Sequence, residues 1–459
     1  MRTSLRNRHP RFLGLLAAAV ATALSALLFS ATNANAATPT AQVVLFGSDI
    51  GALYQGSGSN ASTAVVVTHE TDDFINAAPC TQLVQRGFTA LCFKSQYTSD
   101  GEISWDQLAI GVGKAVSYLR SLSGIKHVVL VGWSGGGAIS AYYQNVAENG
   151  VAACQGADEL DPCSDSLAGL PPADGVVLLD SIPGLAFADT GQLNASVIPA
   201  DGLTSLKNPF LDPFRSANGY NSDETMPSAY TQEFIDRYTQ AQGDREAALV
   251  DAAQRLQQQI KGGREAFTND LPFLFGHDAA AIWSLDPNIL GHTQGAYPLI
   301  TPSSPNGTVQ VVYTVRNPAA AGSLASTPAS DNTWGVDKTA YSVNTFMSVS
   351  AIKAPRFRLT ADSIEGVDWA SSNTATVANV AGISKPLLVM GMTAHYWMVP
   401  AELYYKAATR SSSKTLAFVY GAIHGFTPCT ACTSMPYGPY GDTEGETFNY
   451  VANWLQTHF

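Results

Sequence analysis

Short apolar runs that alternate with helical patterns are the feature that most restricts the fold of this chain. Four runs lie in its first part: Ala64–Thr68, Thr89–Phe93, His127–Gly132 and Gly175–Leu179. They are continuous rather than alternating, which is typical of strands buried on both faces of a parallel sheet. Helical patterns separate them, at Cys80–Arg86, Trp105–Ser121 and Gly136–Ala147. This order predicts an α/β fold with a doubly wound, mostly parallel sheet.

The strand–helix order stops near Ile182 and resumes at Pro386–Met390. The intervening stretch holds a polar helical pattern at Pro227–Lys261, followed by a segment rich in Ser, Thr, Asn and Pro. Because the sheet pattern resumes afterwards, we interpret Gly184–Ser384 as a large inserted cap. The core is then built from residues 37–183 and 385–459.

The first 36 residues have the order of a signal peptide. Four arginines precede the apolar run Phe12–Phe29, and the small-residue triplet Ala34-Asn35-Ala36 follows it. We expect cleavage after Ala36 and a secreted mature protein. An uncleaved membrane anchor is the alternative for this segment.

The composition is that of a compact globular protein, with 46% hydrophobic and 14% charged residues. The signal segment holds four arginines and no acidic residue, so its removal changes the formal charge from −12 to −16. An acidic surface repels phosphate backbones and anionic lipids. We therefore expect neither nucleic acid nor, after signal cleavage, a membrane as a partner. The sequence leaves the oligomeric state open.

Six cysteines are present, and an even number in an exported chain suggests disulfide bonds. Fifteen pairings of six cysteines are possible. Closeness in the sequence favours Cys154–Cys163 and Cys429–Cys432, which leaves Cys80 with Cys92. A structural zinc site would need a second CxxC-like pair, and the chain has only Cys429-Thr-Ala-Cys432.

The motif with the clearest chemistry is Gly132-Trp133-Ser134-Gly135-Gly136-Gly137. It follows a predicted buried strand and opens a predicted helix, which is the context of a nucleophile elbow. Glycines are needed around such a serine because side chains would clash in the sharp turn. The motif lacks the lysine of a P-loop and the spacing of a dinucleotide-binding turn. Ser134 is therefore the candidate nucleophile.

A serine nucleophile needs a general base, and His424 follows the last predicted strand between two glycines. Together, Ser134 and His424 resemble the α/β-hydrolase superfamily, in its esterase and lipase branch. The resemblance covers residues of about 40–182 and 385–459. It implies the α/β-hydrolase fold and a Ser-His-acid triad, with the catalytic His after the last strand.

The oxyanion hole requires two backbone N–H donors. One is expected from Gly135, the residue after the nucleophile. The resemblance places the other after the strand Ala64–Thr68, where hydrolases usually carry His-Gly. Here the sequence reads His69-Glu70-Thr71, so the glycine is missing. Thr71 is the predicted donor, with Glu70 as its alternative, and His69 is interpreted as a residue that braces the loop.

The triad acid is less directly marked. In most of the superfamily it follows the penultimate strand, but that place holds no acid in this chain and carries His395. Asp180 ends the strand Gly175–Leu179, a position from which some lipases draw their acid. We therefore predict Asp180, with Glu402 and cap acids such as Asp368 as alternatives.

Two further groups of residues have open roles. His395 is expected to pack or to contact substrate, because it cannot replace a carboxylate as an anion. A metal cluster of His277, His292 and His395 is disfavoured, because no helical spacing brings these residues together. Four tryptophans either line an apolar substrate pocket or fill the core of the insertion: Trp283, Trp334, Trp369 and Trp397.

These patterns predict a secreted serine hydrolase that cleaves a carboxylic ester of an apolar or aromatic small molecule, without a cofactor or metal. An amidase, a lactonase or a C–C bond hydrolase could use the same triad, because the fold does not fix the substrate. From another class, a catalytically inactive hydrolase-like binding protein is the alternative.

Overall fold

The computed structural model describes residues 40–95, 103–201, 206–223, 226–264, 270–276, 281–316, 338–432 and 440–459. The predicted signal peptide lies outside the described residues, as do His277 and Trp334. Within the described part of the chain, no helix is both long and apolar enough to cross a membrane.

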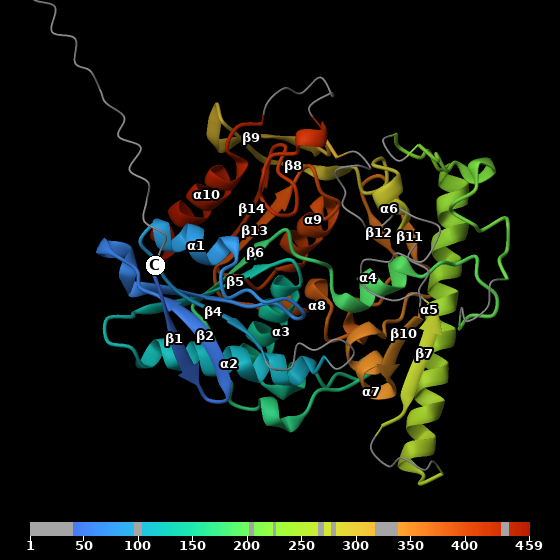
Figure 1. The fold of residues 1–459 in the computed structure, drawn as a ribbon, viewed down its shortest axis with the longest axis horizontal. Helices are drawn as coiled ribbons and strands as arrows, with labels where there is room; N and C mark the ends of the chain where they lie inside the picture. The colour runs from blue at the N-terminus through green and yellow to red at the C-terminus, as the bar shows by residue number, and fades with distance from the viewer. Residues whose placement is uncertain are drawn as a thin grey trace, which may run out of the picture. The chain divides into compact units, whose positions relative to one another are not determined.

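A ten-stranded sheet forms the centre of the residues that follow Ala37, in the order β1-β2-β4-β3-β5-β6-β13-β14-β8-β9 (Figure 1). The strands are β1 (Ala41–Phe46), β2 (Asp49–Tyr54), β3 (Thr63–Val67), β4 (Thr89–Lys94), β5 (His127–Trp133), β6 (Gly175–Leu179), β8 (His292–Thr301), β9 (Ser304–Tyr313), β13 (Leu387–Met392) and β14 (Lys414–Val419). All neighbouring pairs from β4 to β8 are parallel, whereas β1–β2, β2–β4 and β8–β9 are antiparallel. The predicted α/β fold with a mostly parallel sheet is confirmed.

The structure differs from the predicted cap boundary at β8 and β9. Both strands lie within the segment Gly184–Ser384, yet β8 pairs in parallel with β14 and extends the core sheet. The strand β9 is an edge strand with mostly exposed side chains. An edge strand of this kind lacks the continuous apolar run of a buried strand, so in the sequence its polar residues resemble an irregular segment.

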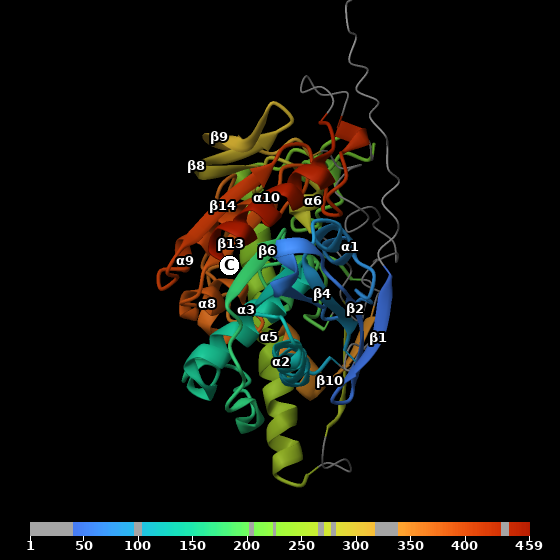
Figure 2. The ribbon, with the colours of Figure 1, turned by 90° about the vertical axis from the view of Figure 1, so that its left-hand side faces the viewer.

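Helices cover both faces of the sheet. One face carries α1 (Ala78–Gln85) and α10 (Thr443–His458), and the other carries α2 (Trp105–Ser121), α3 (Gly135–Asn149), α8 (Thr376–Gly382) and α9 (Met398–Ala407) (Figures 1 and 2). In β3, the side chains of Val65 and Val67 pack in the core beneath α1 and α10, and that of Val66 packs in the core beneath α2 and α3. Successive strand residues face opposite sides, so burial on both faces requires the unbroken apolar run seen in the sequence.

The remaining elements of the insertion gather beside the sheet (Figure 1). They are α4 (Leu185–Gln192), α5 (Gln232–Lys261), α6 (Ile282–Leu285), α7 (Val343–Thr345), and two short pairs of strands, β7 (Pro272–Gly276) with β10 (Lys338–Ser342) and β11 (Arg358–Leu359) with β12 (Ile364–Glu365). The long helix α5 begins after Thr231, whose side chain accepts the Phe234 N–H at 3.2 Å. This cap satisfies one of the free donors at the helix start.

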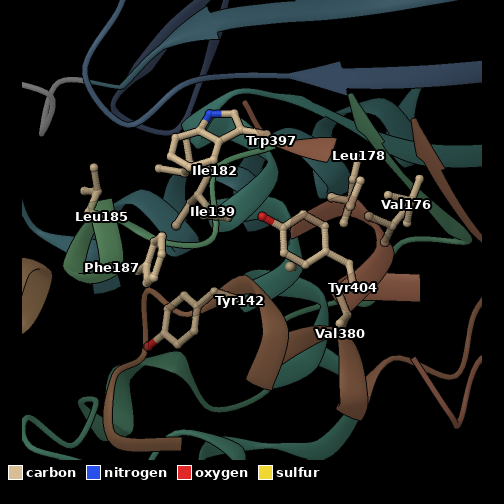
Figure 3. Close-up of a cluster of buried hydrophobic side chains, with 14 of the residues drawn as sticks. Ile139, Tyr142, Val176, Leu178, Ile182, Leu185, Phe187, Val380, Trp397 and Tyr404 are labelled. Atoms are coloured by element: carbon tan, nitrogen blue, oxygen red, sulfur yellow. The ribbon is translucent and has the colours of Figure 1, made fainter. Parts of the chain in front are cut away.

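One buried cluster joins the insertion to the core (Figure 3). Ile139 and Tyr142 come from α3, and Phe187 comes from α4 in the insertion. Trp283 is 1% exposed and stacks on Phe187, with ring centroids 5.9 Å apart. Trp369 contacts the same ring at 5.3 Å. For Trp283, burial on this scale agrees with the second of the two predicted roles, filling the core of the insertion.

The three disulfide bonds are the three pairs that sequence distance favoured: Cys80–Cys92, Cys154–Cys163 and Cys429–Cys432. The first connects α1 to the neighbouring strand β4, and the last closes a short loop after β14.

Candidate active site

Ser134 lies in the sharp turn between β5 and α3. Its backbone has φ +58° and ψ −129°, which a residue with a side chain rarely adopts and which costs about 1–3 kcal/mol. A side chain on Gly132 would overlap the backbone of Gly136 and Gly137, so glycine is required where the strand passes the helix. This is the strained geometry that a nucleophile elbow needs.

The end of β6 supports the elbow through two backbone hydrogen bonds. The Ser134 N–H donates to the Leu179 carbonyl at 3.2 Å, and the Ile182 N–H donates to the Ser134 carbonyl at 3.2 Å. Ser134 and Asp180 are therefore held in neighbouring turns, at the carboxyl ends of adjacent parallel strands. Ligands of open α/β sheets bind at this edge.

His424 lies in the loop after β14, and two contacts fix its position. The indole Nε1 of Trp133 donates to the His424 carbonyl at 2.9 Å, which ties the loop to the residue before Ser134. The His424 Nδ1 is 2.6 Å from Asp180 Oδ2. Since the carboxylate accepts from Nδ1, the other ring nitrogen, Nε2, carries the lone pair of the neutral ring.

Asp180 is fully buried and has a left-handed φ of +44°. Its Oδ1 accepts the Met392 N–H at 3.3 Å. Burial alone would raise the pKa of Asp180, but the neighbouring His395 and His424 outweigh it and lower the pKa to about 2. The carboxyl group is thus an anion at neutral pH, which is what stabilising a histidine cation requires.

The alternative acids lie elsewhere. Glu402 accepts hydrogen bonds from the Gln294 N–H, the Gly295 N–H and the Tyr297 hydroxyl, at 2.8–2.9 Å, and thus anchors the start of β8. It lies in the second turn of α9, which begins at Met398. Asp368 precedes the short helix Trp369–Ser371 and its N–H bonds to the Lys353 carbonyl.

His395 was expected to pack or to contact substrate, and it lies against Asp180. Its Nδ1 is 2.6 Å from Asp180 Oδ2, off the axis of an ideal hydrogen bond, and its ring stacks on His424 with centroids 4.3 Å apart. Burial, followed by the charges of His424 and Arg316, lowers the pKa of His395 to about 4 against the opposing effect of Asp180. His395 is therefore a neutral ring beside the carboxylate. In the sequence, the only sign of this contact was that His395 follows the penultimate strand, where the superfamily usually has its acid.

The same three residues have the donor set of a metal site. One ligand atom each from Asp180, His395 and His424 lies within 4.8 Å of the others. Two histidines and a carboxylate suit zinc or ferrous iron. However, both Nδ1–Oδ2 separations are 2.6 Å, whereas two tetrahedral ligands at about 2.0–2.2 Å from zinc lie roughly 3.3 Å apart. The spacing fits a direct hydrogen bond from His424 and a close contact with His395 better than a bridging ion.

His292, from the metal cluster that the sequence disfavoured, packs on Tyr313, with ring centroids 5.2 Å apart.

The predicted oxyanion residues lie on two elements. Gly135 is the first residue of α3, where backbone N–H groups have no partner within the helix. The Thr71 N–H donates to His69 Nδ1 at 3.2 Å, and the Asp72 N–H donates to the same nitrogen at 3.0 Å. His69 thus braces this loop, and in this arrangement the Thr71 amide is directed at the histidine.

The Cys429–Cys432 bond closes the segment that follows His424, and the Cys429 N–H donates to the Gly421 carbonyl at 2.8 Å, across the loop that holds His424. We expect the double variant Cys429→Ser, Cys432→Ser to lose activity at a lower urea concentration than the one that unfolds the sheet. Activity and far-UV circular dichroism, followed in one urea titration, measure the two transitions. The matched control Cys154→Ser, Cys163→Ser removes a bond far from His424 in the sequence. If the Cys429→Ser, Cys432→Ser variant lost activity and unfolded at the same urea concentration, the disulfide would have no separate role in holding the His424 loop.

No family model matches the chain, and no curated protein matches it in sequence. Several solved structures are similar to it. A siderophore hydrolase, EstB, from Aspergillus fumigatus is 11% identical with a TM-score of 0.42, and the match covers 92% of this chain and 98% of that one. A soluble variant of monoglyceride lipase from Saccharomyces cerevisiae is 13% identical with a TM-score of 0.38, over 92% and 95%. A proline iminopeptidase from Mycobacterium smegmatis is 11% identical with a TM-score of 0.36, over 91% and 98%.

The strand order of the sheet, the strained serine between β5 and α3, and the histidine after β14 are features of one architecture. The chain has the α/β-hydrolase fold.

Proposed function

We propose that the protein is a secreted serine hydrolase that cleaves a carboxylic ester of an apolar or aromatic small molecule through an acyl-enzyme. The observation that carries the proposal is the 2.6 Å contact between His424 Nδ1 and the buried carboxylate of Asp180, in a loop tied by Trp133 to the strained Ser134. A charged carboxylate is costly to bury, so it is retained where it stabilises a cation.

In the acylation step, Ser134 Oγ attacks the ester carbonyl and His424 Nε2 takes the hydroxyl proton. The carbonyl oxygen becomes an oxyanion beside the first turn of α3, where the Gly135 N–H stabilises it. Asp180 stabilises the His424 cation without accepting its proton. The C–O bond then breaks, and His424 returns the proton to the leaving alcohol.

In the deacylation step, His424 takes a proton from water, whose oxygen attacks the acyl carbon. Collapse of the second tetrahedral intermediate restores Ser134 and releases the carboxylic acid. None of these steps needs a cofactor.

The proposed substrate class rests on the aromatic rings near the histidines. The ring centroids of Tyr396 and Trp397 lie 3.9 and 5.9 Å from that of His395, and Phe74 stacks on Trp133 at 5.0 Å; all three side chains are almost fully buried. Pockets for small molecules are lined mainly by such side chains. The formal charge of −12 disfavours anionic substrates.

Secretion is proposed from the signal-peptide pattern and from the pairing of all six cysteines, since such bonds persist in oxidising compartments. Secretion of the natural protein with its N-terminus at Ala37 tests this part.

A panel of p-nitrophenyl esters with acyl chains of increasing length tests the function. We expect turnover with at least one apolar ester, with a burst of p-nitrophenol equal to the enzyme concentration if deacylation is the slow step. The matching anilides distinguish an amidase. Absence of turnover on the whole ester panel by folded protein, together with turnover of an anilide, would replace the esterase by the amidase.

A further inference from the structure

A second ionisable group lies against the oxyanion site. Glu70 follows β3 and is 0% exposed. Its carboxyl group occupies the space that a side chain on Gly135 would fill, so it lies directly on the Cα of the residue proposed to donate to the oxyanion. Glycine is required at position 135 because the Glu70 carboxyl group fills the space where a side chain would lie.

The surroundings of this carboxyl group do not suit an anion. No other described residue forms a hydrogen bond with either carboxyl oxygen. His69 Nδ1 lies 3.2 Å from Glu70 Oε2, and this nitrogen already accepts the N–H groups of Thr71 and Asp72. It therefore presents a lone pair and carries no proton. A carboxylate 3.2 Å from that lone pair would be repelled by it, whereas a neutral carboxyl group would not.

The charged groups around Glu70 lead to the same conclusion. Burial raises the pKa of Glu70 to about 8, with a smaller rise from Asp72 and a partial offset from its own backbone N–H. His69 supplies no positive charge, because burial and then His424 lower the pKa of His69 to about 3. The first turn of α3 has only glycines at 135–137, so it offers no charged side chain, although the positive end of the helix favours the anion.

We propose that Glu70 is a further residue of the oxyanion site, which it supports only as the neutral carboxylic acid, and that its ionisation sets the alkaline limit of catalysis. The proposal rests on the proposed serine-hydrolase function. A negative charge next to Gly135 opposes the negative charge that develops on the substrate carbonyl oxygen, and the water-poor site leaves this repulsion poorly screened. The neutral acid removes the repulsion.

Glu70→Gln is the direct test, because the amide has the size and neutrality of the acid but cannot ionise. The rate at which a fluorophosphonate probe labels Ser134 is measured from about pH 6 to about pH 9.5. We expect the wild-type rate to fall above about pH 8, approaching tenfold per pH unit, and the Glu70→Gln rate to stay within about threefold of its neutral value. Two results would overturn the proposal: the same alkaline decline in Glu70→Gln, or a folded variant that is unreactive at every pH.

A measurement without catalysis tests the neutral state of Glu70 separately. In the folded protein the pKa of Glu70 is raised from 4.5 to about 8, so between these values the folded state binds more protons than the unfolded state. Stability then falls as pH rises through this window. The urea midpoint of the wild type should decline relative to Glu70→Gln across this range and not below it. If the difference between the two urea midpoints stayed constant from about pH 4.5 to about pH 8, Glu70 would be ionised in the folded protein and the proposal would fail.

Asp72→Asn covers the case in which Glu70→Gln does not fold. The Asp72 side chain is 71% exposed, and its charge raises the pKa of Glu70. Its removal should move the alkaline decline to lower pH, and an unmoved or oppositely moved decline counts against Glu70 as its cause. If wild-type protein is neither labelled nor active on any ester, the proposed function fails, while the urea comparison still decides the state of Glu70.

Discussion

Replacing Ser134 by alanine is expected to abolish ester hydrolysis, with a loss in kcat on the order of 10⁶-fold. The variant removes only the oxygen that forms the acyl-enzyme. Alanine keeps the Cβ, so the left-handed φ of +58° is equally strained in both proteins and the stability should be almost unchanged. Steady-state kinetics with the best ester of the panel, and thermal unfolding of both proteins, measure the two effects.

A neighbouring serine offers a matched control. Ser140 lies on α3, where its hydroxyl donates to the Gly136 carbonyl at 2.6 Å, and Ser140→Ala removes the same atom from the same helix. We expect it to keep kcat within about threefold while losing up to about 1 kcal/mol of stability with the hydrogen bond. Fluorophosphonate labelling followed by peptide mapping should find the probe on Ser134 in Ser140→Ala and nowhere in Ser134→Ala. A probe on another serine would remove Ser134 as the nucleophile.

The parts of the fold that the sequence predicted are those in which local pattern and tertiary environment agree. The run Gly175–Leu179 is unbroken because both of its faces are buried, and the structure has the same bounds for β6. The pattern Trp105–Ser121 likewise matches α2. The strand β9 was missed because its environment is solvent on most sides, so its residues carry no burial signal.

The candidate site shows the same division. Ser134 and His424 each lie near a glycine that the structure requires, Gly132 for the first and Gly421 for the second, and glycine positions are visible in a sequence. The contact of His395 with Asp180 joins residues 215 positions apart and depends on the neighbouring ends of β6 and β13. Nothing local encodes that contact. The neutral environment of Glu70 is also invisible in sequence, because it results from what surrounds the side chain.

The second large effect is expected at Asp180, where Asp180→Asn should lower kcat by about 10²–10⁴-fold with little change in KM. The amide is of similar size but carries no charge, so it neither stabilises the His424 cation nor holds the ring in the tautomer with Nδ1–H. Two rings depend on this group, because Nδ1 of His395 and Nδ1 of His424 each lie 2.6 Å from the same oxygen. An asparagine oxygen can still accept from one of them, while its NH₂ group has no acceptor to replace the lost charge.

The pH dependence of stability gives Asp180 a second signature. Its pKa is lowered in the folded protein from 3.8 to about 2, so the folded state binds fewer protons than the unfolded state in that window. The contribution of Asp180 to stability is therefore present above about pH 4 and is lost as pH falls through 2. The difference in urea midpoint between the wild type and Asp180→Asn should be constant at neutral pH and shrink on acidification below about pH 4.

Glu402→Gln is the matched control, because it makes the same chemical change at the other candidate acid. Glu402 accepts two backbone N–H groups and the Tyr297 hydroxyl, and its pKa is lowered because these bonds and Lys406 outweigh burial. An amide can accept only at its single oxygen, so the variant should lose stability while kcat falls less than about tenfold. The two variants thus separate an acid that acts on His424 from one that anchors β8. A folded Asp180→Asn enzyme with nearly normal kcat, beside an inactive and folded Glu402→Gln, would transfer the triad role to Glu402 and leave the 2.6 Å contact of Asp180 with His424 without a catalytic purpose.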